Sequence, residues 1–192
     1  GQVNLTPSTA YDCYIGPVNE PTAQIKWTPG QNPSKPGTLE VKGTIFLDAN
    51  VMWENLSLIQ YDGRATIYTS GTLTLKNQTD LCGVEACDAT WDPSQDFLTM
   101  VVGSMTSATN TTPDTVLVDN FTTFQGAIYA VNDYTQGNNT TIWGPVIARN
   151  ASISNSSLFK PLPGALGGLP PGMPSSTTTQ TQVTLVQGSY AG

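Results

Sequence analysis

Short apolar runs that end quickly at Gly, Asn or Asp are the feature that most constrains the fold of this 192-residue chain. β-branched and aromatic residues dominate these runs, and such residues favour strands. No stretch repeats apolar residues every three to four positions, so we expect almost no helix. The clearest runs are 39–41, 44–47, 56–59, 65–68, 72–75, 97–102, 116–118, 127–131 and 145–148.

The spacing of these runs indicates how they assemble. Comparable positions at Ile45, Ile67, Met100, Ile128 and Ile147 lie 22, 33, 28 and 19 residues apart. This irregular period fits one turn of a β-solenoid with loops of variable length, whose stacked parallel strands bury inward apolar rows. The sequence therefore predicts an all-β fold, a right-handed parallel β-helix with irregular loops. The alternative is a β-sandwich or jelly roll, in which turns recur about every 8 to 12 residues.

The N-terminal part and the Pro-rich part differ from the middle of the chain. Residues 1–38 contain six Pro and one strand run at 24–27, and we expect them to cap a solenoid body that spans 39–159. Residues 160–175 are so rich in Pro and Gly that they cannot continue a ladder of strands, and they predict an extended crossing.

The C-terminal segment 176–192 contains a strictly alternating stretch. Thr181, Val183, Leu185 and Gln187 lie on one face of this stretch if it is extended. We expect a half-buried edge strand and tail. The long lead-in allows this strand either to return along the body or to reach a neighbouring subunit, where it would act as an assembly strand.

The composition is polar but weakly charged. The chain has 28 Thr, 14 Ser and 13 Asn, but only 7 Lys and Arg against 14 Asp and Glu, and it has no His. The net charge of −7 argues against nucleic acid and anionic membranes as partners. The absence of His excludes Ser-His-Asp chemistry and His-based metal sites. No apolar stretch approaches 18 residues, so no membrane span is expected.

The three cysteines bear on the cellular compartment. Four residues that include Gly83 separate Cys82 from Cys87, which lets the chain turn back and predicts a local disulfide. The alternative is two buried free thiols. A zinc site is less favoured still, because one Cys pair without His cannot complete its four ligands. Cys13 would then remain unpaired, either buried or available for an intermolecular bond.

Nine Asn residues begin an Asn-x-Ser/Thr triplet, which is the acceptor for N-glycosylation in a secreted chain. A chain so rich in Asn, Ser and Thr also produces several such triplets by chance. Together with the disulfide, the triplets favour an extracellular or cell-surface glycoprotein. They begin at Asn4, Asn55, Asn77, Asn110, Asn120, Asn138, Asn139, Asn150 and Asn155.

The densest acidic cluster surrounds the cysteine loop. Calcium takes six to eight oxygen ligands from such loops, so a structural Ca²⁺ is a candidate here, and no other cofactor is expected. The competing interpretation is that the Asp residues form turns. The five acids are Asp80, Glu85, Asp88, Asp92 and Asp96.

Two other sets of residues point to less favoured functions. Four Asp at strand ends, if they converged, would resemble the carboxylate pair of a polysaccharide-degrading β-helix enzyme. Exposed aromatic residues would form a sugar-stacking platform, with Trp53 and Trp143 as the best candidates and core packing as the competing role. The four Asp are Asp48, Asp62, Asp119 and Asp133.

Several sequence elements also carry a resemblance to a known family. The elements are GTIFLD at 43–48, the loop LCG at 81–83 that leads to Trp91, and GMP at 172–174. Across roughly residues 20–175 the chain resembles largely uncharacterised surface proteins of Gram-positive, mainly actinobacterial, genomes. In these proteins a pilin-like (PilX-like) membrane-anchoring N-terminus precedes a β-helical exterior domain. The anchoring segment is not among these residues, and Asp48 is followed by Ala-Asn where that family leads us to expect Gly.

These observations together predict a non-catalytic, extracellular structural or adhesive module of a cell-surface appendage or filament. Its expected partners are further copies of itself or other surface proteins, contacted through the terminal strand or the open solenoid ends. The alternatives are a glycan-binding surface module and a carboxylate-dependent polysaccharide hydrolase or lyase.

Overall fold

The computed structural model describes residues 1–30, 35–54, 58–103, 115–164, 168 and 170–173. These residues form sixteen strands and no helix, so they contain no helix that could span a membrane. The strands are β1 (Gln2–Asn4), β2 (Tyr11–Ile15), β3 (Ala23–Thr28), β4 (Gly37–Leu47), β5 (Asn50–Trp53), β6 (Ile59–Asp62), β7 (Arg64–Thr69), β8 (Leu73–Leu75), β9 (Asp80–Cys82), β10 (Phe97–Val102), β11 (Thr115–Val118), β12 (Thr123–Gln125), β13 (Ala127–Gln136), β14 (Thr141–Trp143), β15 (Val146–Ile153) and β16 (Leu158–Lys160).

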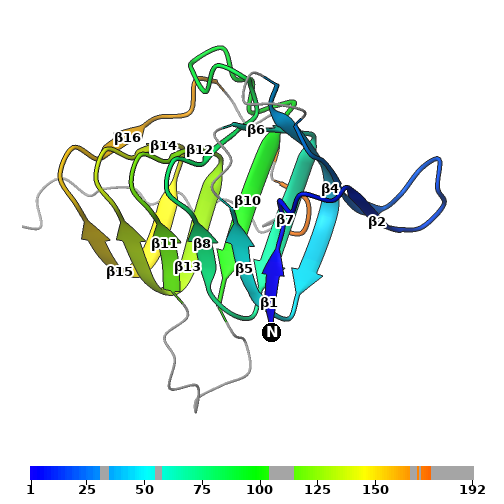
Figure 1. The fold of residues 1–192 in the computed structure, drawn as a ribbon, viewed down its shortest axis with the longest axis horizontal. Helices are drawn as coiled ribbons and strands as arrows, with labels where there is room; N and C mark the ends of the chain where they lie inside the picture. Colours follow the sequence, from blue (N-terminus) through cyan, green and yellow to red (C-terminus); the bar gives the residue numbers. More distant parts are fainter. Residues whose placement is uncertain (31–34, 55–57, 104–114, 165–167, 169, 174–192) are drawn as a thin grey trace, which may run out of the picture.

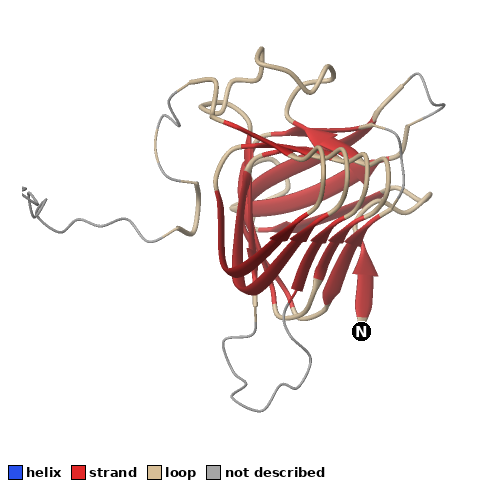
Figure 2. Ribbon diagram, turned by 90° about the vertical axis from the view of Figure 1, so that its left-hand side faces the viewer, coloured by secondary structure: helices blue, strands red, loops and turns tan. Residues whose placement is uncertain are grey.

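The strands pair in three parallel ladders, and we call each passage of the chain through the three ladders a coil. Figure 1 shows the strands side by side along the long axis, and Figure 2 shows the turns of successive coils nested behind one another. The first ladder contains the second half of β4, then β7, β10 and the first halves of β13 and β15. The second ladder contains β1, β5, β8, β11 and the second halves of β13 and β15. The third ladder contains the first half of β4, then β6, β9, β12, β14 and β16. The predicted all-β class is confirmed.

The register of the first ladder agrees with most of the strand alignment predicted from the spacing of the apolar runs. Four of the five positions aligned from the sequence are direct neighbours across the ladder: Ile45, Ile67, Met100 and Ile128. The fifth was wrong, because Val146 rather than Ile147 pairs with Ile128. A shift of one residue turns a strand over, so Ile147 faces outward and is 58% exposed.

The inward positions of the ladders form one continuous apolar core. Ile67, Met100 and Ile128 are at most 2% exposed, and the indole of Trp53 and the ring of Phe124 are fully buried. Each large side chain buried in this way contributes about 1.5–3 kcal/mol to folding. Because each member of a row packs on the same position of the next coil, the core depends on the register of the ladders.

One turn recurs in four coils, between the second and third ladders. Each copy is an Asn-x-Thr/Ser triplet whose middle residue has a left-handed backbone, with φ between 55° and 59°. In three of the four copies the hydroxyl of the third residue donates to a carbonyl of the preceding coil: Thr79 to Glu54 at 3.0 Å, Thr122 to Lys76 at 3.1 Å, and Ser157 to Gly137 at 3.0 Å. The four copies are 77–79, 120–122, 138–140 and 155–157.

The same turns are also bonded to the coil that follows. The backbone N–H of Phe121 donates to the carbonyl of Asn138 at 3.0 Å, and that of Asn139 to the carbonyl of Asn155 at 3.2 Å. The side-chain oxygen of Asn120 accepts from the Asn138 N–H at 2.8 Å. Stacked Asn residues therefore hold one corner of the coils in register, which gives these triplets a structural role.

The N-terminal region contains more strand than the sequence predicted. Within 1–38, β1 begins the second ladder and β2 and β3 form an antiparallel hairpin, whereas only 24–27 stood out in the sequence. β3 pairs antiparallel with β4, so the hairpin extends the third ladder by two strands. Figure 1 shows this hairpin projecting beyond the body.

After β16 the chain runs back along the outside of the first ladder. The Arg64 guanidinium donates to the Gly168 carbonyl at 2.7 Å, and the Tyr68 hydroxyl donates to the Gly172 carbonyl at 2.9 Å. These bonds hold the Pro/Gly-rich segment as a strap that leads from the last coil back to the first. The assembly strand predicted at Thr181, Val183, Leu185 and Gln187 lies outside the described residues.

The corrected register is tested by placing an acid on either side of β15. We expect Val146→Asp to lower the free energy of unfolding by about 1–3 kcal/mol, because it puts an unpaired carboxylate at an inward position. Ile147→Asp carries the same strand-propensity cost but faces water, and we expect a change within about 0.5 kcal/mol. Urea unfolding of both variants measures the difference, and equal losses would contradict the register.

Candidate functional site

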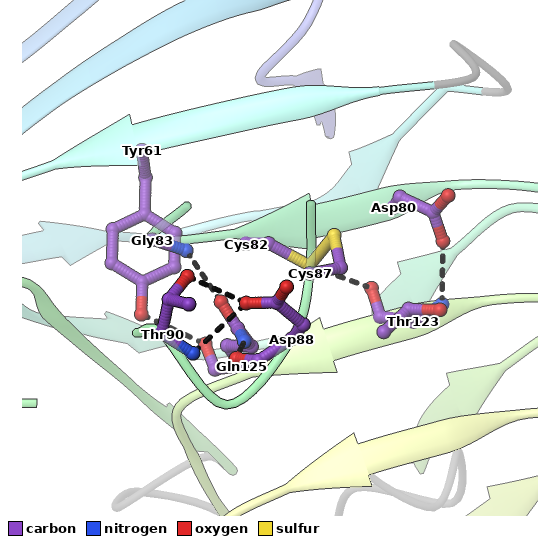
Figure 3. Close-up of a disulfide and its surroundings, with 9 residues drawn as sticks. All are labelled: Tyr61, Asp80, Cys82, Gly83, Cys87, Asp88, Thr90, Thr123 and Gln125. Atoms are coloured by element: carbon purple, nitrogen blue, oxygen red, sulfur yellow. Dashed lines mark hydrogen bonds between the residues drawn. A yellow bond between two sulfur atoms is a disulfide. The ribbon is translucent and has the colours of Figure 1, made fainter. Parts of the chain in front are cut away.

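The most elaborate polar arrangement of the described residues surrounds the cysteine loop. The structure contains the Cys82–Cys87 disulfide predicted from the sequence (Figure 3). The loop follows β9, the strand that pairs with β6 and β12 in the third ladder. Cys13 is a free, exposed thiol on β2, not a buried one.

Gln125 at the end of β12 holds this loop against the body. Its side-chain oxygen accepts from the Gly83 N–H at 3.1 Å, and its amide nitrogen donates to the Asp88 carbonyl at 2.8 Å (Figure 3). The side chain is fully buried, so both bonds lie in a region that excludes water. Gln125 was not among the residues predicted from the sequence. Its one signal was a polar residue following the inward Phe124.

Aromatic residues complete the packing under the loop. The Tyr61 hydroxyl donates to the Gln125 carbonyl at 3.0 Å, and burial raises the pKa of this phenol well above its usual value. The Trp91 indole N–H donates to the Asp96 carbonyl at 2.7 Å, and its ring stacks on Phe97 with centroids 5.8 Å apart. The loop is therefore a rigid, hydrogen-bonded projection.

The acids of the predicted calcium cluster are engaged in local bonds. Asp88 accepts from the hydroxyl and N–H of Thr90, and Asp92 from those of Ser94; these bonds lower the pKa of both carboxyls. Asp80 accepts from the Thr123 N–H at 3.1 Å. Partial burial raises the pKa of Asp80.

Glu85, another acid of the predicted calcium cluster, is exposed in the same loop. Nowhere in the described ranges do three or more acidic or cysteine side chains gather in a metal-binding group. Asp88 and Asp92 form the local turns of the competing interpretation, and the calcium site stays a prediction.

Asp96 has a different environment. Its carboxylate accepts from the Gly63 N–H at 2.7 Å. Burial, together with hydrogen bonding to and repulsion from the Asp62 carboxyl, raises the pKa of Asp96. Two neighbouring carboxylates repel each other, which is one of the causes of the raised pKa of Asp96. Asp62 and Asp96 are therefore the pair of carboxyls that the structure brings together.

A polar cleft of about 560 Å³ lies beside Asp62, between the strap and the N-terminal strands. Glu40, Lys42, Asp62 and Arg64 contribute its charged side chains, and Glu40 also forms a 2.6 Å ion pair with Lys26. Asp96 does not line this cleft, so Asp62 and Glu40 supply its carboxyls and Lys42 and Arg64 its cations.

The other three strand-end acids do not reach this cleft. Asp48 accepts from the Ser70 hydroxyl at 2.5 Å, Asp119 accepts from Asn120, and Asp133 accepts from the Asn150 amide at 2.8 Å. Asp48 and Asp133 lie where the chain passes from the first ladder to the second, and Asp119 lies where it passes from the second to the third. Asp62 ends a strand of the third ladder, so the four strand-end carboxylates do not converge.

The tryptophans give little support to a sugar platform. Trp53, one of the two best candidates from the sequence, is fully buried in the core, as are Trp27 and Trp91. Trp143 is half-buried, and the ammonium of Lys160 lies 4.3 Å from the centre of its ring. A cation over the ring occupies the face that a sugar would use.

The glycosylation triplets fall in two groups. Asn77, Asn138, Asn139, Asn150 and Asn155 are exposed, whereas Asn4 and Asn120 are half-buried. Asn55 and Asn110 lie outside the described residues. Acceptor function stays a prediction, but four of these triplets have the structural role of the stacked turn.

Comparison of the chain with protein-family models, with curated proteins and with solved structures finds no match. What the molecule does must therefore be inferred from its own residues.

The role of Gln125 is tested by Gln125→Leu, which leaves the Gly83 N–H and the Asp88 carbonyl without partners. We expect the free energy of unfolding to fall by about 1–3 kcal/mol and proteolysis of the loop to accelerate. Gln95→Leu, an exposed change in the same loop, is the matched control and should have little effect. Equal urea midpoints for the two variants would contradict this role.

The Asp62–Asp96 pair predicts a pH-dependent stability. Because the pKa of Asp96 is raised in the folded protein, its contribution is full below the unfolded pKa, about 3.9, and is lost as the pH rises through the folded pKa. Asp96→Asn keeps the acceptor for Gly63 but removes the charge, so it should stabilise the protein at pH 7 and have little effect near pH 3. Thermal melting across this range measures the effect.

Asp92→Asn is the control of opposite sign. The pKa of Asp92 is lowered by its bonds to Ser94, so its contribution is present above the unfolded pKa and is lost as the pH falls through the folded value. This variant should not gain stability at pH 7. An identical pH profile for both variants would show that the Asp62 contact has no effect.

Proposed function

We propose that the protein is a non-catalytic structural module of the cell exterior, a right-handed β-solenoid that associates with further copies through its last coil. The parallel ladders are the kind of strand pairing that a solenoid requires. In this proposal the module is a structural or adhesive part of a surface appendage or filament. The resemblance to surface proteins with β-helical exterior domains supports it.

The observation that carries the proposal is that many polar side chains bond to other parts of the same chain. The Asn-x-Thr turns bond to neighbouring coils, Asp88 and Asp92 form local turns, and Gln125 fixes a loop. These polar side chains are thus engaged in holding the turns, the loop and the coils of the same chain. This is what we expect of a passive building block.

Two features support an exterior location. The Cys82–Cys87 disulfide favours an oxidising compartment. Five of the triplet Asn residues are exposed and accessible to glycans. Neither feature requires a bound ligand or a membrane span.

The last coil supplies a surface for association. Within the described residues, β15 and β16 each pair on one side only, with β13 and β14. Phe159 continues the row of the fully buried Ile142 yet is 46% exposed, and Ile153 and Leu158 are each 53% exposed. Unpaired strand edges beside exposed apolar residues favour contact with another chain.

The distribution of charge favours a second copy of the protein as the chain that contacts the last coil. Residues 134–192 contain Arg149 and Lys160 but no Asp or Glu, whereas the whole molecule has a net charge of −7. The cationic last coil is therefore attracted to the acidic surface of a neighbour, and this attraction weakens with salt.

The proposal predicts that the protein associates reversibly and that Phe159→Asp weakens this association at least about tenfold, because it places a charge in the apolar contact. Tyr129→Asp, at an exposed outward position of the first ladder, is the matched control and should associate normally. Sedimentation velocity over a range of concentrations and salt measures both.

Two results would contradict the proposal. One is wild-type protein that stays monomeric at every concentration tested. The other is polysaccharide turnover that Asp62→Asn abolishes, since this would assign the polar cleft to catalysis. A glycan array is expected to be blank.

A further inference from the structure

The three ladders begin at different levels at the N-terminal end of the stack, and the first ladder begins last. Its first described strand is Gly43–Leu47, the second half of β4. The second ladder has one more strand, β1, before β5, and the third has two more, β3 and β2, before β4. The outer edge of Gly43–Leu47 is therefore recessed between β1 and the β2–β3 hairpin.

The recessed edge presents backbone groups that have no strand beside them among the described residues. The Leu47 carbonyl accepts from the Ser70 N–H at 3.0 Å, so the backbone groups of Leu47 face β7. Because these groups point to alternate sides along a strand, those of Thr44 and Phe46 face the recess. An edge of this kind pairs readily with an added strand.

The recess is also an apolar groove of about 470 Å³. It is lined by Ile45 and Leu47, which are half-buried although the next member of the row of Ile45, Ile67, is 2% exposed. Val3 from β1 and Ile25 from β3 line it as well. Of the described residues that form its lining, none carries a charge. The groove therefore suits apolar, uncharged side chains.

Two hydrogen bonds fix the hairpin against the segment that follows β1. The Tyr11 hydroxyl donates to the Leu5 carbonyl at 2.6 Å, and the Trp27 indole N–H donates to the Pro7 carbonyl at 2.7 Å. Both walls of the groove are thus joined to each other without any contribution from a ligand. A segment that binds between them does not have to order them first, which favours binding.

The height of the walls determines which kind of partner reaches the edge. Neighbouring strands lie about 4.8 Å apart, so the hairpin extends roughly two strand spacings beyond Gly43–Leu47. A second folded copy that brought its own sheet edge against Gly43–Leu47 would collide with these strands. A single extended segment fits between the walls, and every second side chain of it lies on the inward side, beside Ile45 and Leu47.

We propose that the groove binds an extended, uncharged segment of another protein, which adds as a strand to Gly43–Leu47. Its backbone bonds to Thr44 and Phe46, and two apolar side chains at alternate positions cover Ile45 and Leu47. This site lies at the opposite end of the stack from the last coil. It is independent of association between copies and gives the module a partner of a different kind.

Synthetic peptides of seven residues, acetylated and amidated at their ends, test the proposal. In each peptide two apolar residues, chosen from Val, Leu and Phe, alternate with Ser and Thr. We expect at least one peptide to bind the full chain with a Kd below about 1 mM in calorimetric titration. Because the exposed Cys13 lines the groove, saturating peptide should slow its reaction with Ellman's reagent at least about tenfold.

Two further sets of peptides separate strand addition from apolar contact alone. A peptide with the same residues, but with its two apolar residues adjacent, places them on opposite faces of a strand and should bind at least about tenfold more weakly. Methylation of one alternate set of backbone nitrogens should abolish binding, and methylation of the other set should not. Equal effects of the two methylated sets, or no binding by any peptide, would overturn the proposal.

Protein variants locate the site. Leu47→Asp places a charge in the groove and should abolish peptide binding, whereas Tyr129→Asp, on the outward side of the same ladder, is the matched control and should bind normally. Circular dichroism checks that both variants are folded. Peptide binding that survives Leu47→Asp would contradict the assignment. Phe159→Asp should leave peptide binding unchanged, so failure of this inference and failure of association through the last coil are distinguishable.

The rate of the Cys13 reaction without peptide identifies any other occupant. A rate that falls as the protein concentration rises would assign the groove to a second copy and overturn the proposal. A slow rate at every concentration that increases in a chain ending at Met173 would assign it to the protein's own C-terminal segment, and would overturn it as well.

Discussion

Parallel pairing between successive coils determines which side of every strand faces the core. Ile67, Met100 and Ile128 are buried because each lies directly beside the next in the first ladder. A slip of one residue would turn a whole strand outward, as the opposite environments of Val146 and Ile147 illustrate. The coils therefore need strong register control. The stacked Asn-x-Thr turns supply it at one corner, because they are hydrogen-bonded to neighbouring coils.

This requirement explains the composition. Thr and Asn are abundant because their side chains bond to the backbone of adjacent coils, and charge is scarce because such a stack needs little of it. Gln125 follows the same logic in the disulfide loop. The proposed exterior role rests on this use of the polar groups, and the proposed association depends on the last coil, where the described pairing stops.

The sequence predicted the all-β class, the disulfide and most of the first ladder, because β-branched runs and their spacing are local signals. It did not reveal β1, β2, β5, β9, β12, β14 and β16, most of which are short strands whose partners are distant in sequence. Gln125 was missed because a buried glutamine has no local signature. The pairing of Asp62 with Asp96, rather than with Asp48, Asp119 or Asp133, depends on a fold contact between residues 34 positions apart.

Parallel pairing is complete inside the stack and stops at its last coil. Amide hydrogen exchange of the full chain at low and high protein concentration tests it most directly. We expect slow exchange in Arg64–Thr69 and Phe97–Val102 at both concentrations. In β15 and β16 we expect exchange that is fast in dilute protein and slows on association. Equal protection of β15, β16 and the interior strands in dilute protein would contradict it.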